Sequence, residues 1–453
     1  MLDSLEASDI DAGYVSVQPE VRLGLPFKPM AVGTSWFDWP ALPDLFQVSF
    51  PGVKTSRDGF LVDTDLDRLQ LRIADYFDAG KSHDDIARRY PAAMKSTARF
   101  DARAVRELLL KRGGPSEDGF ISFAYRPFDT RWLYWEKDGA LLDRPRPDYR
   151  PQTFPGNVAL VTQQKPRREW SPPQVVSHMG CLDLMDRGAT YIPMYLREDG
   201  QSKINLRQTM YRGDKTVQHY LDRLGLGVED LFHHVLAVLH DPIYREANAG
   251  ALRMEWPRIP LPAWPDGGAE GAAEVIAKSA THGREIAALL DPGTPVLGVT
   301  KTPRRPEIEA VAVPATVSRR NMTANDFAVT AGWGYHGQSQ AVMPGQGRAV
   351  ERDYTPEERA ALGDAMQFLG ETTLDIHLNA NAFWRNIPSA VWNYKLGGYQ
   401  VLKKWLSYRE QAVLGRVLNT DEVQYFSDIA RRIAAILITT SKNAEIATRL
   451  SGV

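Results

Sequence analysis

The sequence predicts an α+β fold, with a β-rich central region, flanking helical segments and a helical C-terminus. Residues 119–200 contain short apolar runs that Pro, Gly or Asp interrupt, a pattern typical of strands. Helical periodicity and helix-capping signals lie on both sides of this region. The chain has 453 residues, which is too long for one ordinary hydrophobic core. We therefore expect two or three structural units.

The first 60 residues are rich in Pro, Trp and Phe and predict irregular chain with short strands. Strands are expected at residues 46–50 and 59–62, on either side of a polar loop at residues 52–58. A helix should follow, because Thr64 can cap it and apolar residues then recur on one face. That face consists of Leu66, Leu69, Ile73 and Phe77.

A second helix is expected over residues 102–111, where Gly113 and Gly114 end it. The central region then predicts short strands. They cover residues 120–125, 132–135, 158–162, 175–176 and 191–196. Helices return at residues 228–240, ended by Asp241-Pro242, and at residues 269–290, with an extended proline-rich segment at residues 257–265.

Residues 291–350 are rich in Gly, Pro and Thr and predict an insertion or a small β element. A helix start follows, with Thr355 as the cap, Pro in the first turn and Glu358 three residues after the cap. The last helix is expected over residues 419–440. These features divide the chain into four units, at residues 1–115, 116–290, 291–350 and 351–453.

The net charge is −2 at pH 7, which argues against a protein that is basic over its whole surface. A local stripe of cations is still enough to bind a nucleic acid. Two such stripes also contain aromatic residues. The first, with Asp148 as its only acid, contains Arg144, Arg146, Arg150, Lys165, Arg167 and Arg168. The second, without any acid, contains Arg385, Lys395, Lys403, Lys404 and Arg409.

The decapeptide from Tyr125 to Tyr134, YRPFDTRWLY, combines four aromatic residues, two arginines and one aspartate. Arg126 and Arg131 offer forks of donors that suit phosphates and guanine edges. Aromatic rings beside them can stack on bases or hold a guanidinium group. An ordinary strand with polar residues on its solvent face explains the same composition. The two arginines can equally pair with Asp129 inside the fold.

The sequence predicts no catalytic centre. Residues 332–337 spell GxGxxG, but Pro344 and two more glycines follow where a dinucleotide site needs a helix. No GxxxxGK[ST] sequence occurs, so the chain has no P-loop. Residues 171–174, SPPQ, are similar to a tetrapeptide of amino-methylating DNA methyltransferases, but Gln174 cannot stack on a flipped base as the aromatic residue there does. A proline turn beside a basic loop is the simpler interpretation.

The sequence also predicts no metal site. His233, His234 and His240 lie on one expected helix, but no carboxylate joins them at metal-ligand spacing. The single cysteine, Cys181, excludes an internal disulfide and a multi-cysteine zinc site, and we expect it to be a buried structural residue. No run of about 18 apolar residues occurs, and the acidic start differs from a signal peptide. A cytoplasmic protein is the simplest expectation.

Six segments, in this order, resemble the C-terminal target-recognition (specificity) region of Type ISP restriction-modification enzymes and related large adenine-specific DNA methyltransferases. They are residues 43–46 followed by 52–58, the decapeptide, residues 191–196, 240–245 and 256–261, and residues 391–394 with 397–406. The resemblance covers residues 42–438, and residues 291–380 fit it poorly.

The resemblance implies a sequence-specific DNA target-recognition module of a restriction-modification or DNA-methylation defence system, with no catalysis of its own. Residues 1–115 would then follow a methyltransferase core that this chain lacks. Such a module holds duplex DNA against an N6-adenine methyltransferase domain or subunit, beside which a helicase-like motor can work, and reads a short asymmetric site. S-adenosylmethionine is expected only in the methyltransferase partner, and no cofactor is expected in this chain.

The basic residues of the matching segments and stripes form the expected DNA-facing set. It consists of Lys54, Arg57, Arg126, Arg131, Lys165, Arg167, Arg168, Lys395, Lys403 and Lys404. One alternative function stays open, an assembly subunit that binds a methyltransferase or motor partner and touches DNA only within the complex. The aromatic and proline-rich first 60 residues favour it, because a partner can cover them.

Overall fold

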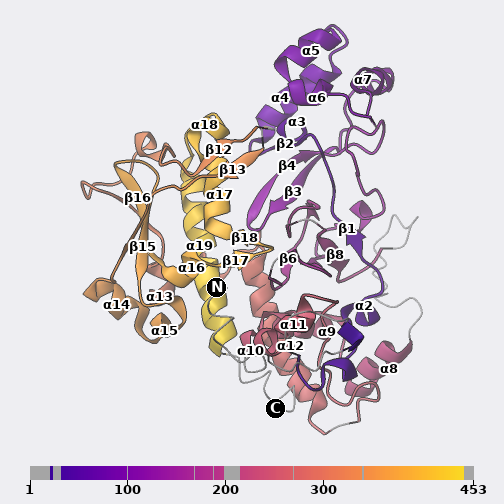
Figure 1. Cartoon of the computed structure of the whole chain (residues 1–453), viewed down its shortest axis with the longest axis vertical. Helices are drawn as coiled ribbons and strands as arrows, with labels where there is room; N and C mark the ends of the chain where they lie inside the picture. The colour runs from indigo at the N-terminus through magenta and orange to yellow at the C-terminus, as the bar shows by residue number, and fades with distance from the viewer. Residues whose placement is uncertain are drawn as a thin grey trace, which may run out of the picture.

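The computed structural model describes residues 21–23, 32–98, 100–167, 169–186, 188–197, 215–268, 270–338 and 341–442. Its elements confirm the predicted α+β class, with a β-rich centre, helices on both sides and a long helix near the C-terminus (Figure 1). None of the described helices is long and apolar enough to cross a membrane.

Short helices from the first quarter of the chain form one end of the molecule (Figure 1). They are α3 (Asp58–Leu61), α4 (Leu66–Phe77), α5 (His83–Arg89), α6 (Pro91–Met94) and α7 (Ala102–Lys111), and α2 (Leu42–Leu45) precedes them. The α7 helix has the bounds that the sequence predicts. Asp65, rather than Thr64, caps α4, because its carboxylate accepts a hydrogen bond from the backbone N–H of Arg68 at 3.2 Å.

The two strands predicted in this region are wrong in part. The first shrinks to β1 (Phe50–Pro51). Most of the second is the helical turn α3, and only its last residue enters β2 (Val62–Asp63). The reason is that a run of four apolar or small residues is too short to show a period, so a strand and a buried helical turn give the same pattern.

Two four-stranded sheets form the β-rich centre. The first, in the order β1-β8-β5-β6, is antiparallel throughout. In the second, in the order β2-β4-β3-β7, β3 and β4 form a hairpin and β7 runs parallel to β3. The further strands are β3 (Phe120–Arg126), β4 (Asp129–Tyr134), β5 (Ala159–Thr162), β6 (Gln174–Val176), β7 (Met179–Gly180) and β8 (Thr190–Pro193). All five strands predicted here are confirmed, with shifted ends.

Helices from the middle of the chain lie at the opposite end from α4–α7 (Figure 1). They are α8 (Lys215–Leu224), α9 (Val228–His240), α10 (Pro242–Ala247), α11 (Ala249–Leu252) and α12 (Ala272–Leu290). The bounds of α9 match the prediction. The α9 and α12 helices pack closely at Gly283, where a Cβ atom would lie 1.8 Å from the carbonyl oxygen of His233, so only glycine fits.

A third sheet joins residues on both sides of the boundary predicted at residue 350. It is antiparallel, in the order β11-β16-β15-β14. Its strands are β11 (Val313–Thr316), β14 (Ala349–Arg352), β15 (Thr373–His377) and β16 (Ala382–Pro388). Two-stranded pairs are β9 (Leu297–Gly298) with β10 (Lys301–Arg304), β12 (Gly334–His336) with β13 (Val342–Pro344), and β17 (Lys395–Leu396) with β18 (Tyr399–Gln400). The β structure expected within residues 291–350 is present.

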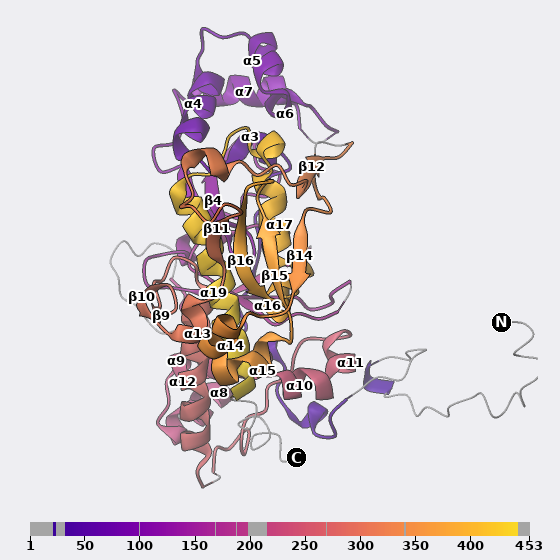
Figure 2. The same ribbon diagram turned by 90° about the vertical axis from the view of Figure 1, so that its left-hand side faces the viewer.

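Two helices, α17 (Val401–Arg409) and α19 (Thr420–Lys442), lie between the third sheet and the β-rich centre (Figures 1 and 2). The other helices of this part are α13 (Pro306–Glu309), α14 (Pro356–Leu362), α15 (Met366–Leu369), α16 (Ser389–Trp392) and α18 (Gln411–Leu414). As predicted, Thr355 caps α14 and Glu358 completes the capping box.

Among the described residues, the buried apolar side chains form two clusters. The smaller cluster fills the space between the second sheet and α4 to α7, and includes Tyr125 and Leu133 of the β3–β4 hairpin. The larger one surrounds α9, α12, α17 and α19. Phe128, at the tip of the same hairpin, belongs to the larger cluster. The hairpin therefore contributes side chains to both clusters. The division of the chain into four units stays a prediction.

Candidate nucleic-acid interface

The decapeptide folds as the β3–β4 hairpin, with Pro127 and Phe128 between paired residues Arg126 and Asp129. Phe128 has a φ of 55°, a left-handed conformation that costs a non-glycine residue about 1 kcal/mol. Its ring is fully buried in the larger cluster. The hydroxyl of Tyr425 in α19 donates a hydrogen bond to the Phe128 carbonyl at 2.8 Å. These contacts hold the hairpin tip in its strained conformation.

Asp129, the first residue of β4, is buried and forms ion pairs with two arginines. Its carboxylate lies 2.7 Å from Arg131 Nη2 and 2.7 Å from Nη2 of Arg409, at the end of α17. Burial alone would raise the pKa of Asp129, but the attraction of Arg131 and Arg409 lowers it well below its ordinary value. Of the interpretations that the sequence allowed for Arg131, the structure therefore shows the pairing with Asp129 inside the fold.

Arg126 is also engaged inside the fold. Its guanidinium group lies 4.1 Å from the Tyr125 ring centre and donates to the Tyr125 carbonyl at 2.6 Å and to Cys181 Sγ at 3.2 Å. Arg57 is 7% exposed, stacks 3.2 Å from the Phe100 ring centre, and donates to a backbone carbonyl at 2.8 Å. Burial lowers the pKa of Arg57.

The expected DNA-facing set stays a prediction, and these positions show which of its members lie inside the described fold. In the described fold the guanidinium groups of Arg57, Arg126 and Arg131 contact protein groups and have little exposed surface, so we remove all three from the candidate interface. The physical reason is that an arginine beside aromatic residues satisfies its donors as well within a core as on a phosphate.

Three lysines of the set lie nearer the surface. Lys54 is exposed and forms an ion pair with Asp143, with an Nζ to Oδ2 distance of 2.9 Å. Lys404 lies over the Tyr408 ring, 4.5 Å from its centre. Lys403, on the same helix, is partly exposed and has no ion pair within the described residues. Neither Lys54 nor Lys404 is therefore free of protein contacts.

Lys165 and Arg167 lie on the loop between β5 and β6, and both side chains are exposed. No described residue forms a hydrogen bond or ion pair with either of them. Arg168, the third cation predicted on this loop, lies outside the described residues. The loop therefore presents at least two free cations to solvent.

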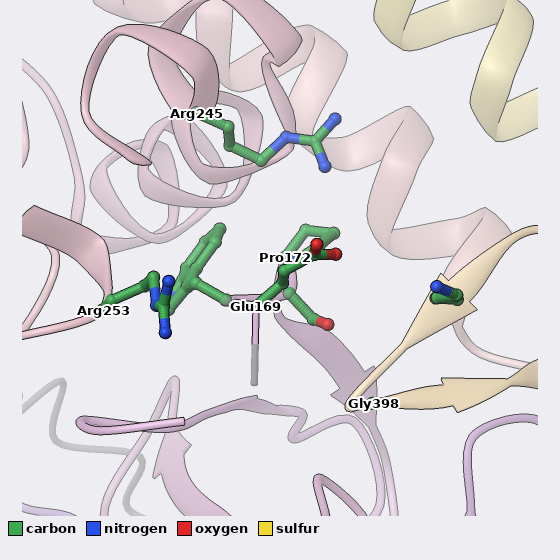
Figure 3. A pocket seen from close by; sticks show the side chains of 8 residues that line it. Glu169, Pro172, Arg245, Arg253 and Gly398 are labelled. Atoms are coloured by element: carbon green, nitrogen blue, oxygen red, sulfur yellow. The ribbon is translucent and has the colours of Figure 1, made fainter. Parts of the chain in front are cut away.

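The same loop continues into a pocket of about 520 Å³, which also contains Lys395 (Figure 3). The lining residues are Glu169, Trp170, Ser171, Pro172, Arg245, Arg253, Lys395 and Gly398. Arg245 extends from α10 and Arg253 from the end of α11 toward Glu169 and Pro172, and Gly398 lies across from them (Figure 3). Segments distant in sequence thus bring three cations and one acid to one hollow.

Short-range contacts fix the walls of this pocket. The Nε2 atom of His240, at the end of α9, donates a hydrogen bond to the Pro173 carbonyl at 2.8 Å and holds the proline turn. Asp241 caps α10 by accepting hydrogen bonds from Ile243 and Tyr244. Burial lowers the pKa of His240 to about 3 and raises the pKa of Asp241 to about 6. Both side chains therefore have structural roles in the pocket wall. The neutral imidazole of His240 still carries the Nε2–H that its hydrogen bond needs.

Lys395 is positioned by the β17–β18 hairpin, where Lys395 pairs with Gln400. The turn requires Gly397 and Gly398, which have φ values of 57° and 80°. At Gly397, a Cβ atom would lie 2.8 Å from the Cα atom of Met185. The two glycines thus allow the hairpin to pack tightly against the centre of the fold and hold Lys395 at the pocket.

Other sites considered from the sequence take different roles. The GxGxxG segment contains β12, which pairs with β13, and the next described element after it is this strand rather than a helix. Gln174 is buried in β6, as a residue of a sheet. Cys181 is buried, as predicted, and burial raises the pKa of its thiol. No group of three or more His, Cys, Asp or Glu side chains in the described part of the chain could hold a metal ion.

Arg245 and Arg253 were not among the site residues predicted from the sequence. Arg245 ends one of the six ordered segments and follows Asp241 by one helical turn, so its position on α10 was readable. Arg253 carries no local signal, because only the fold brings it opposite the loop of residues 165–172.

Comparisons with known proteins give one family and one fold. The sequence model of the family described as the Type ISP C-terminal specificity domain matches residues 44–289 and 325–434, which is most of the chain. No match was found among curated proteins.

Three solved structures are similar in fold. The DrdV–DNA complex, determined by cryo-electron microscopy, has a TM-score of 0.56 and 21% identity, and the match covers 88% of this chain and 36% of that chain. The ATP-dependent Type ISP restriction-modification enzyme LlaBIII bound to DNA has a TM-score of 0.56, 14% identity, and coverages of 92% and 24%. A nuclease-deletion mutant of the Type ISP enzyme LlaGI in complex with a DNA substrate mimic has a TM-score of 0.51 and 16% identity. That match covers 91% of this chain and 34% of that chain. This chain thus spans only 24% to 36% of the length of those chains.

Proposed function

The chain belongs to the Type ISP C-terminal specificity domain family, and on this premise we propose that it is a target-recognition module that binds duplex DNA. The observation that carries the proposal is the family match over residues 44–289 and 325–434. The similar structures of DrdV, LlaBIII and LlaGI contain DNA or a DNA substrate mimic, and we extend DNA binding from those enzymes to this chain.

In this proposal the chain supplies recognition and no chemistry. It holds duplex DNA against an N6-adenine methyltransferase domain or subunit, which carries S-adenosylmethionine, in an assembly that can include a helicase-like motor. Phosphate contacts set the position of the duplex, and side chains in a groove read the sequence.

The exposed cations of the β5–β6 loop support a phosphate contact. The overall charge of −2 provides no general attraction for DNA, so binding depends on local groups. Lys165 and Arg167 are exposed and have no ion-pair partner among the described residues. A phosphate can therefore approach them without displacing a carboxylate.

The double substitution Lys165→Gln/Arg167→Gln tests this contact. We expect duplex affinity to fall about tenfold near 0.1 M salt, because neither glutamine can neutralise a phosphate, and the slope of log K against log salt to become shallower by about 2. Thermal stability should stay unchanged, since neither side chain bonds to the described fold. Fluorescence anisotropy of a labelled duplex over a salt series measures affinity and slope together.

A charge-matched control separates this loop from general electrostatics. Lys111→Gln/Lys301→Gln removes the same charge from two exposed side chains on α7 and β10. It should leave affinity and slope close to those of the unsubstituted chain. Equal weakening by both pairs would show that the loop makes no particular contact.

One observation favours the alternative of an assembly subunit. Leu71 on α4 and Leu108 on α7 are 69% and 54% exposed, on the helical end of the molecule that a partner could cover. Single exposed leucines are common on monomeric proteins, so this weighs less than the family match. Leu71→Ser/Leu108→Ser should abolish co-purification with a methyltransferase if the alternative holds, and should leave duplex binding by the chain alone unchanged.

A further inference from the structure

The pocket around Arg245, Arg253 and Lys395 has properties that a solvated surface patch does not require. Arginines elsewhere in the described chain are mostly held by carboxylates, as Arg352 is by Glu358 and Asp375. By contrast, no carboxylate of the described residues forms an ion pair with any of the three pocket cations.

The charge balance inside the pocket favours an anion. Among the described lining residues Glu169 is the only acid, against two guanidinium groups and one ammonium group, so their net charge is +2. Arg245 is partly buried, and its Nε atom is 3.3 Å from the Asp241 carbonyl, so part of its fork stays available. Guanidinium forks match the oxygens of a phosphate in pairs.

Trp170 adds a flat apolar surface to the lining of the pocket. Trp170 packs against the larger hydrophobic cluster, and its indole N–H is buried without a hydrogen-bond partner among the described residues. Because this N–H has no exposed surface, Trp170 contributes its ring to the pocket and no donor.

The size of the pocket separates a nucleotide from a simple ion. About 520 Å³ lies within the range of roughly 300–1,000 Å³ that is usual for small-molecule and cofactor sites. A single inorganic phosphate would leave most of this volume empty. A phosphate ester with an attached sugar and base fills it, with its phosphate toward the cations and its planar part against Trp170 and Pro172.

From these features we infer that the pocket binds one nucleotide unit through its phosphate ester. This inference rests on the proposed function for its source, since a DNA strand held by the neighbouring loop can supply the unit. Lys165 and Arg167 lie within four residues of Glu169 on that loop, so a strand that contacts them passes close to the pocket lining. A free nucleotide has the same chemistry and is the other source.

The experiment uses the full chain and the substitutions Arg253→Gln and Lys395→Gln. Both side chains are exposed and have no ion pair in the described fold, so the double variant should fold normally. Lys111→Gln/Lys301→Gln is the control with the same charge. Figure 2 shows β10, which carries Lys301, well away from α10 and α11.

In the DNA arm, anisotropy of a labelled duplex should show about tenfold weaker binding for the pocket variant. The salt slope should become shallower by about 1 for each phosphate that the variant no longer neutralises. In the nucleotide arm, phosphorus NMR should show broadening of the dAMP signal by the unsubstituted chain and none by the pocket variant. Deoxyadenosine, which lacks the phosphate, should not compete with dAMP.

The two arms separate the possible failures. Weaker binding in the DNA arm identifies the strand as the source, and weaker binding in the dAMP arm alone identifies a free nucleotide. If the unsubstituted chain binds duplex DNA but the pocket variant matches the control in both arms, the pocket inference is overturned and the proposed function stands. If the unsubstituted chain binds no duplex but still binds dAMP through Arg253 and Lys395, the proposed function fails and the pocket inference stands.

Discussion

Asp129→Ala is expected to lower the free energy of unfolding by about 3–5 kcal/mol, the range for removing one partner of a buried ion pair. The substitution leaves Arg131 and Arg409 close together without the carboxylate that now lies 2.7 Å from each. Both guanidinium groups are largely buried, so water cannot fully replace the missing carboxylate. Urea denaturation followed by tryptophan fluorescence measures the change.

The control for this prediction is Asp118→Ala. Asp118 also pairs with an arginine, Arg150, but its side chain is 77% exposed. Exposed ion pairs contribute about 0–1 kcal/mol, so this variant should be nearly as stable as the unsubstituted chain. Similar destabilisation of the two variants would show that the buried ion pairs of Asp129 contribute no more stability than the exposed pair of Asp118. Hydrogen exchange should locate the Asp129→Ala effect in β3, β4 and α17.

The pH dependence of the Asp129 effect has a definite sign. The pKa of Asp129 is depressed in the folded chain because the two arginines outweigh its burial. The stability it contributes is therefore fully present above the unfolded-state value of about 3.9 and is lost as the pH falls through the lower folded value. The stability difference between the unsubstituted chain and Asp129→Asn should be constant near neutral pH and shrink below about pH 4. A difference that grows on acidification would contradict the ion-pair account.

Phe128→Ala is expected to cost about 3–5 kcal/mol, the usual range for truncating a fully buried phenylalanine. The ring is the contact through which the β3–β4 hairpin enters the cluster around α17 and α19. Its removal opens a cavity at the point where the two clusters meet. Urea denaturation and hydrogen exchange of α19 both report this destabilisation.

Phe128→Gly separates packing from backbone strain. Glycine lacks the same ring but adopts a φ of 55° without the left-handed penalty. We expect the glycine variant to be more stable than the alanine variant by about 0.5–1 kcal/mol. Leu108→Ala, at a side chain that is 54% exposed, should change stability by less than about 0.5 kcal/mol. An alanine variant as stable as the glycine variant would contradict the strain at this turn.

The fold was predictable where the signals are local. The α7 and α9 helices have the predicted bounds, since Gly113 and Asp241-Pro242 end them through their own backbone preferences. The α14 start at Thr355 is equally local. The pairing of β11 and β14 with β15 and β16 was not predictable in this way, because their partners lie in a part of the sequence that local patterns treat as separate.

The candidate interface was predictable only in part, for the same reason. Lys165, Arg167 and Lys395 are exposed, as a DNA contact requires. Whether Arg131 faces solvent depends on Arg409, which is 280 residues from Asp129 in sequence. Composition showed an arginine beside aromatic residues, but the partner that decides its role comes from the distant helix α17. Arg253 was missed because the pocket residues opposite it, Glu169 to Pro172 and Lys395, are also far from it in sequence.

Selection from a pool of random duplexes tests the central claim, target recognition, most directly. The full chain, alone and with an adenine methyltransferase of a Type ISP system, is used to retain duplexes over several rounds at moderate salt. The account predicts enrichment of one short asymmetric sequence, and a lower yield of the same sequence with Lys165→Gln/Arg167→Gln. Retained duplexes that share no sequence, or no retention with or without the methyltransferase, would contradict it.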